Sequence, residues 1–161
     1  SLNLSFSRYP ISLNFENYIW RQLSHLCNEN FETLDHKTIL KQLKLSIQLM
    51  ELHEENPFKI RSYQGALNSL ERGDQDLTEL SDKALAEIPG VGKSIVEAIQ
   101  SIKSIGTFPT LNELIDKTPA GILEILQIKG LGPKKVKTLW DELGITSTHE
   151  LMEACQSGQV A

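Results

Sequence analysis

Apolar residues recur along this chain at the spacing of helix faces. Ile39, Leu43, Ile47 and Met50 fall three or four positions apart, and a second stripe runs through residues 15–26. Apolar side chains at this period line one face of an α-helix. The sequence has no extended stretch of strict alternation between apolar and polar residues, which would indicate a half-buried strand. The pattern therefore predicts an all-α fold.

Capping residues, prolines and glycines divide this pattern into short helices. Asn56-Pro57 predicts one helix start, because Asn caps helix N-termini and Pro suits the first helical position. Residues 110–113 (Thr-Leu-Asn-Glu) and 147–150 (Ser-Thr-His-Glu) are capping-box patterns that predict two further starts. Gly73 is expected to end the helix that starts at Pro57. Four more helices are expected: one capped by Ser81 and running to Glu87, one over Lys93–Ile105 and ended by Gly106, one from Thr118-Pro119 to about Gln127, and one from Pro133 and ended by Gly144. The residues expected on the buried face of the helix after Pro57 are Phe58, Tyr63, Ala66, Leu67 and Leu70.

Composition narrows the class of protein. With 161 residues, of which 40% are hydrophobic and 23% charged, the chain fits one globular domain or two small ones. No apolar run approaches the roughly 20 residues of a membrane span, so we expect no membrane association. Two cysteines, Cys27 and Cys155, are too few for a disulfide framework and indicate a reducing cytoplasm. The four histidines show no metal-ligand spacing, so we do not expect zinc.

Charge is distributed unevenly along the sequence. The formal net charge is −5, from 16 Lys and Arg against 21 Asp and Glu, which by itself disfavours a nucleic-acid binder. Residues 128–140, however, carry four lysines and no acid, whereas residues 73–87 and 141–161 each sum to −4. A phosphate group responds to charge within a Debye length, roughly 8 Å in physiological salt. The acidic total therefore does not exclude DNA as a partner.

One short motif occurs twice. Residues 85–99 (LAEIPGVGKSIVEAI) and 125–139 (ILQIKGLGPKKVKTL) align at an offset of 40 positions. Each copy is expected to form a helix, a turn with the pattern Ile-x-Gly-apolar-Gly, and a second helix. The matched glycines are Gly90 with Gly130 and Gly92 with Gly132.

Such a turn suits a phosphate. Glycine permits backbone conformations closed to other residues, and the first N–H groups of the next helix lack an intrahelical partner and favour an anion. Lys93 follows the first turn, and Lys134 and Lys135 follow the second. The segment Gly92-Lys93-Ser94 also resembles the end of a nucleotide-binding P-loop. That motif needs glycine where Glu87 stands and a strand where a helix is expected, so we set it aside.

The repeat and its surroundings resemble the N-terminal region of the bacterial family X DNA polymerases, relatives of DNA polymerase beta, which carry tandem helix-hairpin-helix motifs. The resemblance runs from about Lys37 to the C-terminus. The matching segments are residues 55–63 (ENPFKIRSY), 88–93 (IPGVGK), 106–108 (GTF), 118–121 (TPAG), 128–135 (IKGLGPKK) and 143–145 (LGI).

The resemblance implies an organisation and a partner. It divides the chain into an extension (1–35), a polymerase-beta-like N-terminal domain with the first hairpin (36–106), and a SAM-like unit with the second hairpin (107–161). In the family, the first unit holds the downstream end of gapped DNA and the second grips the primer side. The polymerase and phosphoesterase domains follow later in such proteins, and their Mg²⁺ goes with them. We therefore expect a fragment of a bacterial, cytoplasmic repair polymerase that is not catalytic by itself.

The resemblance also assigns binding residues. Lys59 and Tyr63 match the pocket that takes a 5′-phosphate at a gap or nick. The residues expected to bind DNA are Lys59, Tyr63, Gly90, Gly92, Lys93, Ser94, Gly130, Gly132, Lys134, Lys135 and Lys137. The backbone carbonyls expected to hold Na⁺ or K⁺ are those of Ala86, Ile88 and Val91 in the first hairpin and of Leu126, Ile128 and Leu131 in the second.

One activity of the family is not expected here. Its 5′-deoxyribose-phosphate lyase needs a lysine amine to form a Schiff base, and the matching position is Ala98. Two further family lysines fall at Ser94 and near Thr110, while Glu97 matches the family's acidic residue. We expect capture of the 5′-phosphate without lyase chemistry.

Two alternatives stay open at this point. The chain could be a lyase that uses another lysine, with Lys93 and Lys59 as candidates, or a SAM-like protein-interaction module. Phe58 fits either a core position or a ring that stacks on a template base, as the family allows. Trp140 is expected in the core.

Overall fold

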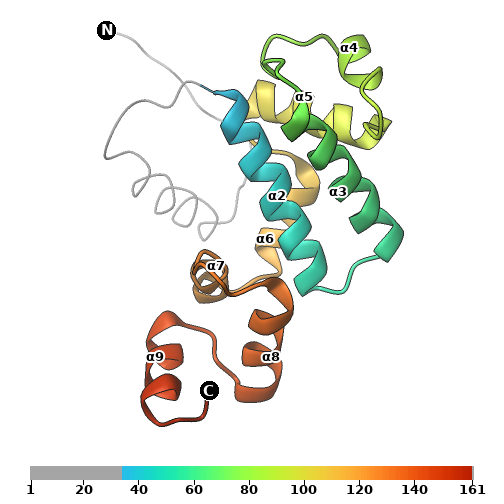
Figure 1. Cartoon of the computed structure of the whole chain (residues 1–161). Coiled ribbons are helices and arrows are strands. Elements are labelled where there is room, and N and C mark those ends of the chain that lie inside the picture. The colour runs from blue at the N-terminus through green and yellow to red at the C-terminus, as the bar shows by residue number, and fades with distance from the viewer. Residues whose placement is uncertain (1–33, 161) are drawn as a thin grey trace, which may run out of the picture. The chain divides into compact units, whose positions relative to one another are not determined.

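The computed structural model describes residues 34–160. This part of the chain contains eight α-helices and no strand, so the predicted all-α fold is confirmed there. The predicted stripe over residues 15–26 lies outside the described residues. The helices, drawn in Figure 1, are α2 (His36–Leu52), α3 (Pro57–Arg72), α4 (Asp82–Ala86), α5 (Lys93–Ile105), α6 (Pro109–Asp116), α7 (Ala120–Leu126), α8 (Pro133–Leu143) and α9 (Thr148–Gln156).

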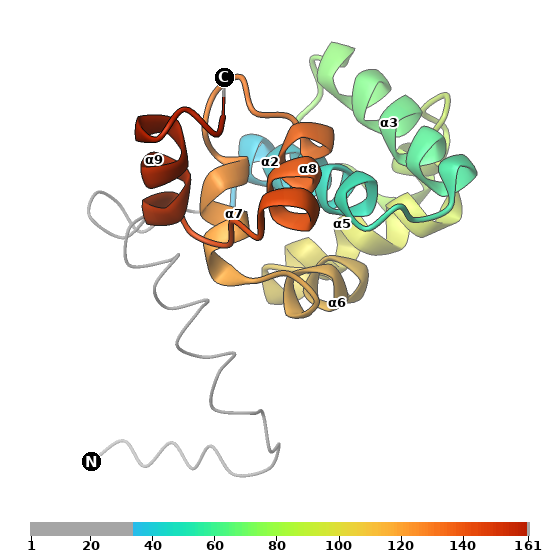
Figure 2. The same ribbon diagram turned by 90° about the horizontal axis from the view of Figure 1, so that it is seen from below.

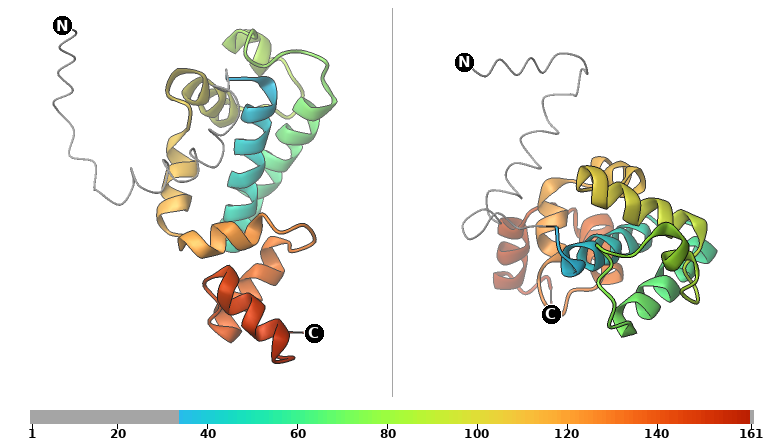
Figure 3. Two further views of the ribbon diagram at one scale, coloured as in Figure 1. Left: turned by 90° about the vertical axis from the view of Figure 1, so that its left-hand side faces the viewer. Right: turned by 90° about the horizontal axis from the view of Figure 1, so that it is seen from above.

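Helix α2 packs against helices from both the earlier and the later part of the described chain. It begins after Asp35, whose carboxylate accepts a hydrogen bond from the Thr38 N–H at 2.7 Å. Its predicted apolar stripe is buried and packs against α3, α6 and α8. Helix α4 lies near the N-terminal end of α2, whereas α8 and α9 lie near its C-terminal end (Figures 1 and 3). Of the two hairpins, α2 therefore packs mainly against the second, through α8.

Helix α3 begins and ends as predicted, but one residue predicted on its buried face is exposed. The Asn56 side chain accepts a hydrogen bond from the Phe58 N–H at 2.9 Å, and the helix stops before Gly73. Four of the five expected residues are buried, whereas Phe58 is 77% exposed and its core assignment is wrong. Phe58 lies about 140° from Tyr63 around the helix axis, so the two side chains cannot share one face.

The two capping-box predictions had different outcomes. The Ser147 hydroxyl accepts a hydrogen bond from the Glu150 N–H at 3.2 Å, and the Glu150 carboxylate accepts one from the Thr146 N–H at 2.7 Å. These bonds confirm the start of α9 and lower the pKa of Glu150. The box at Thr110 is wrong, because α6 already begins at Pro109 and its Phe108 cap makes no side-chain bond. Proline at the first helical position moves the helix start ahead of the box.

Glycines end two helices and permit one close contact. Gly106 and Gly144 have φ values of 80° and 65°, and they terminate α5 and α8 as predicted. A Cβ on Gly121 would overlap the carbonyl oxygen of Thr146, so this glycine lets α7 approach the connection between α8 and α9. Seen from below, α7, α8 and α9 lie together, with α8 close to α2 (Figure 2). None of the helices in residues 34–160 has the length and apolar character needed to cross a bilayer.

Candidate nucleic-acid interface

The repeated motif folds into two hairpins with the same backbone pattern. Helices α4 and α7 end 40 positions apart, and α5 and α8 begin 40 positions apart. The hydrogen bonds of the turns repeat at the same offset. They are Ile88 N–H to Leu85 O (3.2 Å) and Ile128 N–H to Ile125 O (3.0 Å), Val91 N–H to Ile88 O (3.0 Å) and Leu131 N–H to Ile128 O (3.1 Å), and Val96 N–H to Gly92 O and Val136 N–H to Gly132 O (both 3.1 Å). The repeat predicted from sequence is therefore a structural repeat.

The paired glycines give each turn its shape. Gly90 and Gly130 have φ values of 85° and 94°, a left-handed conformation that costs other residues roughly 1–2 kcal/mol. Gly92 and Gly132 are the N-caps of α5 and α8, and neither supplies a side-chain capping bond. A Cβ at either of these two positions would meet no atom within 4 Å. In α5 the N–H groups of Lys93 and Ser94 are thus left to an approaching anion, and in α8, where Pro133 has no N–H, those of Lys134 and Lys135 are left in the same way.

Each turn also presents carbonyl oxygens. The outer carbonyls, those of Ala86 and Val91 in the first hairpin and of Leu126 and Leu131 in the second, accept no hydrogen bond from the described residues. The central carbonyls of Ile88 and Ile128 each accept one bond and keep a second lone pair. Oxygen ligands of this kind suit hard cations. Clusters of three or more His, Cys, Asp or Glu side chains that could hold a metal are absent from residues 34–160.

The lysines that follow the turns differ in their surroundings. Lys134 and Lys135 are exposed on the first turn of α8, and the described residues form no ion pair with them. Lys93 lies 3.7 Å from Glu97 one turn along α5. Lys137 contacts Asp141 at 2.8 Å and Glu54 at 3.7 Å. Its hydrogen bond to Asp141 and the nearby negative charges raise the pKa of Lys137. Of the predicted lysines on α8, Lys137 is therefore the one held by acids.

The expected 5′-phosphate residues lie on α3, which the first hairpin contacts. A Cβ on Gly90 would meet backbone atoms of Gly65 at 3.6 Å, so this turn lies against the middle of α3. Tyr63 is only 5% exposed, and burial raises the pKa of its hydroxyl, although a hydrogen bond with Thr110 opposes the shift. Lys59 is partly exposed, and Phe58 projects into solvent. The charge of Lys59 is therefore more accessible to DNA than the hydroxyl of Tyr63.

The position that matches the lyase lysine lies in the core. Ala98 is 5% exposed and shares the buried face of α5 with Ile95 and Ile102. Its neighbour Glu97 and the earlier Ser94 are exposed. An alanine has no amine for a Schiff base, so this position cannot perform the first chemical step of such a lyase.

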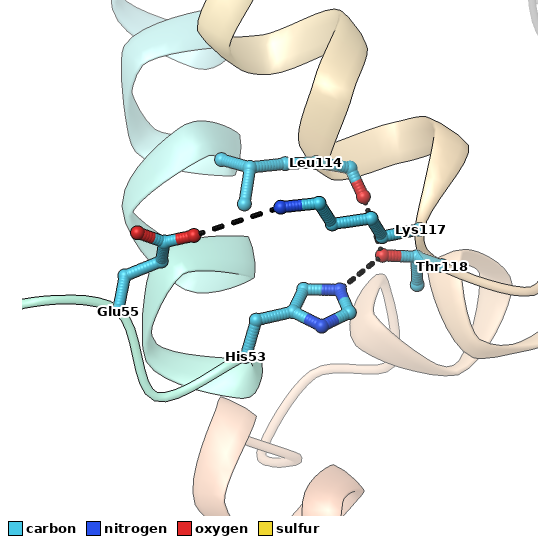
Figure 4. A network of polar contacts seen from close by, with 5 residues as sticks. All are labelled: His53, Glu55, Leu114, Lys117 and Thr118. Atoms are coloured by element: carbon cyan, nitrogen blue, oxygen red, sulfur yellow. Dashed lines mark hydrogen bonds and ion pairs between the residues drawn. The ribbon is translucent and has the colours of Figure 1, made fainter.

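The end of α2 holds contacts that the sequence did not indicate. The His53 Nε2 atom lies 2.7 Å from the Thr118 hydroxyl, which donates a hydrogen bond to the Leu114 carbonyl at 2.7 Å (Figure 4). Because that hydroxyl proton is used, the imidazole is the donor to Thr118. Lys117 approaches Glu55 at 3.9 Å beside it. The partners stand more than 60 residues apart, and no local pattern in a sequence reports such pairs.

Comparisons with known proteins agree with this geometry. Residues 35–108 match the model of a helix-hairpin-helix domain, and residues 122–158 match that of a SAM-like helix-hairpin-helix tandem. Over 124 residues the chain is 34% identical to the DNA polymerase/3′-5′ exonuclease PolX of Bacillus subtilis (strain 168). This chain is a relative of the bacterial family X DNA polymerases. The matched segment is 77% of this chain but only 21% of PolX, so the chain spans about a fifth of that relative.

Proposed function

We propose that this chain binds the backbone of gapped or nicked DNA without reading its sequence. The observation that carries the proposal is the pair of equivalent turns, each with an uncapped helix N-terminus behind two glycines. Backbone N–H groups and helix N-termini contact phosphates and carry no base specificity. The name of the relative, a DNA polymerase and exonuclease, supports DNA as the ligand.

The second hairpin is the main electrostatic contact in this proposal. Lys134 and Lys135 stand on the first turn of α8, and Lys129 lies in the preceding turn, all three exposed. Lysines beside free N–H groups neutralise phosphates and release counterions, which makes the affinity fall with salt. The acidic segment that follows, residues 141–161, confines this contact to a small area.

The first unit captures the 5′-phosphate at the gap. Lys59 on α3 supplies a charge, and the N–H groups at the start of α5, near Lys93 and Ser94, supply further donors. Tyr63 supports this pocket from within the core. With alanine at position 98, the captured sugar-phosphate is held and not cleaved.

A monovalent cation, Na⁺ or K⁺, completes each hairpin in our proposal. The outer carbonyls, which have no hydrogen-bond partner among residues 34–160, fit an oxygen-ligated ion. In the first hairpin these carbonyls belong to Ala86 and Val91, and in the second to Leu126 and Leu131. Such an ion would supply positive charge beside a DNA phosphate.

For the whole protein we propose a repair polymerase of the bacterial cytoplasm. This chain then positions gapped DNA, while nucleotidyl transfer and its Mg²⁺ belong to domains elsewhere in the polypeptide. The chain itself has no catalytic residue in this proposal.

Fluorescence anisotropy with three DNAs tests the binding proposal. They are a gapped DNA with a 5′-phosphate, the same DNA with a 5′-hydroxyl, and an uninterrupted duplex of equal length. We expect affinity in that order, each falling as salt rises, with a slope that reports about two to four neutralised phosphates. Equal affinity for the first two DNAs would contradict phosphate capture. Absence of binding at low salt would favour a protein-interaction module.

Borohydride trapping on DNA with an abasic 5′ end tests the loss of lyase chemistry. A lyase of this family forms a Schiff base that borohydride fixes as a covalent adduct. We expect no adduct above the level given by a Lys93→Ala, Lys59→Ala variant. An adduct that this double variant loses would establish the lyase alternative.

A further inference from the structure

The three residues after α2 contact the connection ahead of α7 and helix α8. We name residues 53–55 the α2 joint. His53 hydrogen-bonds Thr118 at 2.7 Å, and Glu55 pairs with Lys117 at 3.9 Å, both just ahead of α7. Between them, Glu54 pairs at 3.7 Å with a lysine of α8. All three contacts therefore run from the end of α2 to residues 117–137, which include the turn of the second hairpin.

The contacts on the α8 side come from one face of that helix. Lys137 forms an ion pair with Glu54. Trp140, one turn later, packs edge-on against the His53 ring, with ring centroids 6.1 Å apart and an interplanar angle of 88°. Lys137 and Trp140 are both half-buried. Because Pro133 to Lys135 form the first turn of the same helix, the pairing of Lys137 with Glu54 links the second hairpin to the end of α2. The same lysine also pairs with Asp141 of its own helix at 2.8 Å.

The backbone of the joint explains why Glu54 is informative. The Glu54 N–H donates to Glu51 O at 3.3 Å, and the Glu55 N–H donates to Met50 O at 2.9 Å. This pair of bonds is a Schellman motif, in which the residue at the place of Glu54 is left-handed and is usually glycine. Glu54 has a φ of 52°, and among residues 34–160 it is the one residue other than glycine with positive φ. A carboxylate therefore stands here at a conformational cost, and Lys137 is its partner.

We propose that the α2 joint positions the second hairpin relative to the first, so that both grip one gapped DNA at the same time. This inference rests on the proposed function. Two linked sites gain affinity from simultaneous contact only when the geometry allows both to engage. Each of these ion pairs joins one exposed and one half-buried side chain, Glu54 with Lys137 and Lys117 with Glu55, and solvent screens the exposed partner. We therefore expect their removal to change the orientation of the hairpin more than the free energy of unfolding.

Substitutions at Glu54 and Glu55 separate positioning from folding. Glu54→Gly removes the carboxylate and relieves the positive φ, so the thermal midpoint should stay unchanged or rise. Glu54→Gly with Glu55→Gln also removes the second ion pair. The matched control is Glu142→Gln with Glu153→Gln, which removes two exposed carboxylates from α8 and α9 without touching the joint.

The first readout is the ratio of affinities for gapped 5′-phosphate DNA and uninterrupted duplex, in which a general change in charge cancels. We call Glu54→Gly with Glu55→Gln the joint variant. We expect it to lower this ratio about two- to fivefold, whereas the control variant should leave the ratio unchanged. An unchanged ratio in the joint variant, with the wild type preferring gapped DNA, would overturn the positioning role.

The second readout needs no DNA. Spin labels at Glu87→Cys and Gln127→Cys mark equivalent exposed positions in the two hairpins, after Cys27 and Cys155 are changed to Ser. We expect a narrow distance distribution that broadens in the joint variant, and an equally narrow one in both chains would overturn the inference. If the wild type shows no preference for gapped DNA, the proposed function fails, and the distance distribution still decides whether the joint sets the orientation.

Discussion

The two hairpins have the same backbone conformation, but their turns lie in different surroundings. The turn of the first lies against α3 at Gly65, and its Val91 is buried. The turn of the second stands free, since a Cβ on Gly130 would meet no atom within 4 Å and Ile128 is 40% exposed. A helix-hairpin-helix backbone is therefore compatible with both a packed and an open environment.

Side chains at equivalent positions follow this difference. Ile95 in α5 is buried, whereas Lys135, 40 positions later, is exposed on α8. Glu97 matches Lys137, so the sign of the charge is reversed between the copies. Both hairpins have free main-chain N–H groups. The charges of the neighbouring side chains differ, so the two hairpins attract DNA phosphates to different extents.

The largest effect is expected from reversing the charge of the second hairpin. Lys134→Glu with Lys135→Glu should weaken binding to every DNA about 100-fold at low salt and reduce the salt slope by about two, because two phosphate contacts become repulsive. Anisotropy titrations at several salt concentrations measure both quantities.

A matched pair on α2 controls for net charge. Lys41→Glu with Lys44→Glu changes the total charge equally, and both lysines are exposed on α2, outside the two repeated turns. This control should lose no more than about threefold in affinity. Equal losses in the two double variants would show that the second hairpin is no specific contact.

Bulk at the first glycine of each turn probes the packed and the open environments directly. Gly90→Leu and Gly130→Leu each place a side chain at positive φ, at a cost of roughly 1–2 kcal/mol. Only the leucine at position 90 must also fit against α3, which should add about 1–2 kcal/mol of overpacking. Urea denaturation compares the free energies of unfolding. Equal losses would mean that the first turn is as open as the second.

The smallest effect concerns pH at the α2 joint. Burial, followed by the charge of Lys117, lowers the pKa of His53, so the unfolded chain binds a proton on this residue more readily than the folded one. The contribution of neutral His53 to folding stability is therefore fully present above the pKa of about 6.5 that histidine has in the unfolded chain. It is lost as the pH falls through the lower pKa of the folded chain. Thermal midpoints between pH 7.5 and 5 should fall less in His53→Gln than in wild type, and parallel curves would contradict this.

Local signals in the sequence predicted the helices and the repeated turns well. Gly106 and Gly144 ended helices where expected, and the offset of 40 positions reappeared in the turn hydrogen bonds. The predicted capping box at Thr110 was wrong because α6 already begins at Pro109. The predicted burial of Phe58 was wrong because its angle around α3 places it outside the buried face. Boundary rules compete with one another, and the sequence does not show which will prevail.

Contacts between distant segments could not be predicted. The pairing of Lys137 with Glu54 joins residues 83 positions apart, and a lysine-rich stretch gives no sign of which lysine will be neutralised. The burial of Tyr63 was expected from its helix face, but its hydrogen bond with Thr110 depends on how α3 and α6 pack. Residue type indicates which groups can bind phosphate, whereas tertiary packing decides which of them remain available.

The central claim is a division of labour between the hairpins, and residue-resolved amide shifts test it most directly. Nitrogen–proton correlation spectra of the whole chain should be recorded with uninterrupted duplex and with gapped 5′-phosphate DNA. Amides of residues 130–132, 134 and 135 should shift with both DNAs, whereas amides of residues 90–94 should shift with gapped 5′-phosphate DNA alone. Shifts of both segments with either DNA, or of neither, would contradict the division.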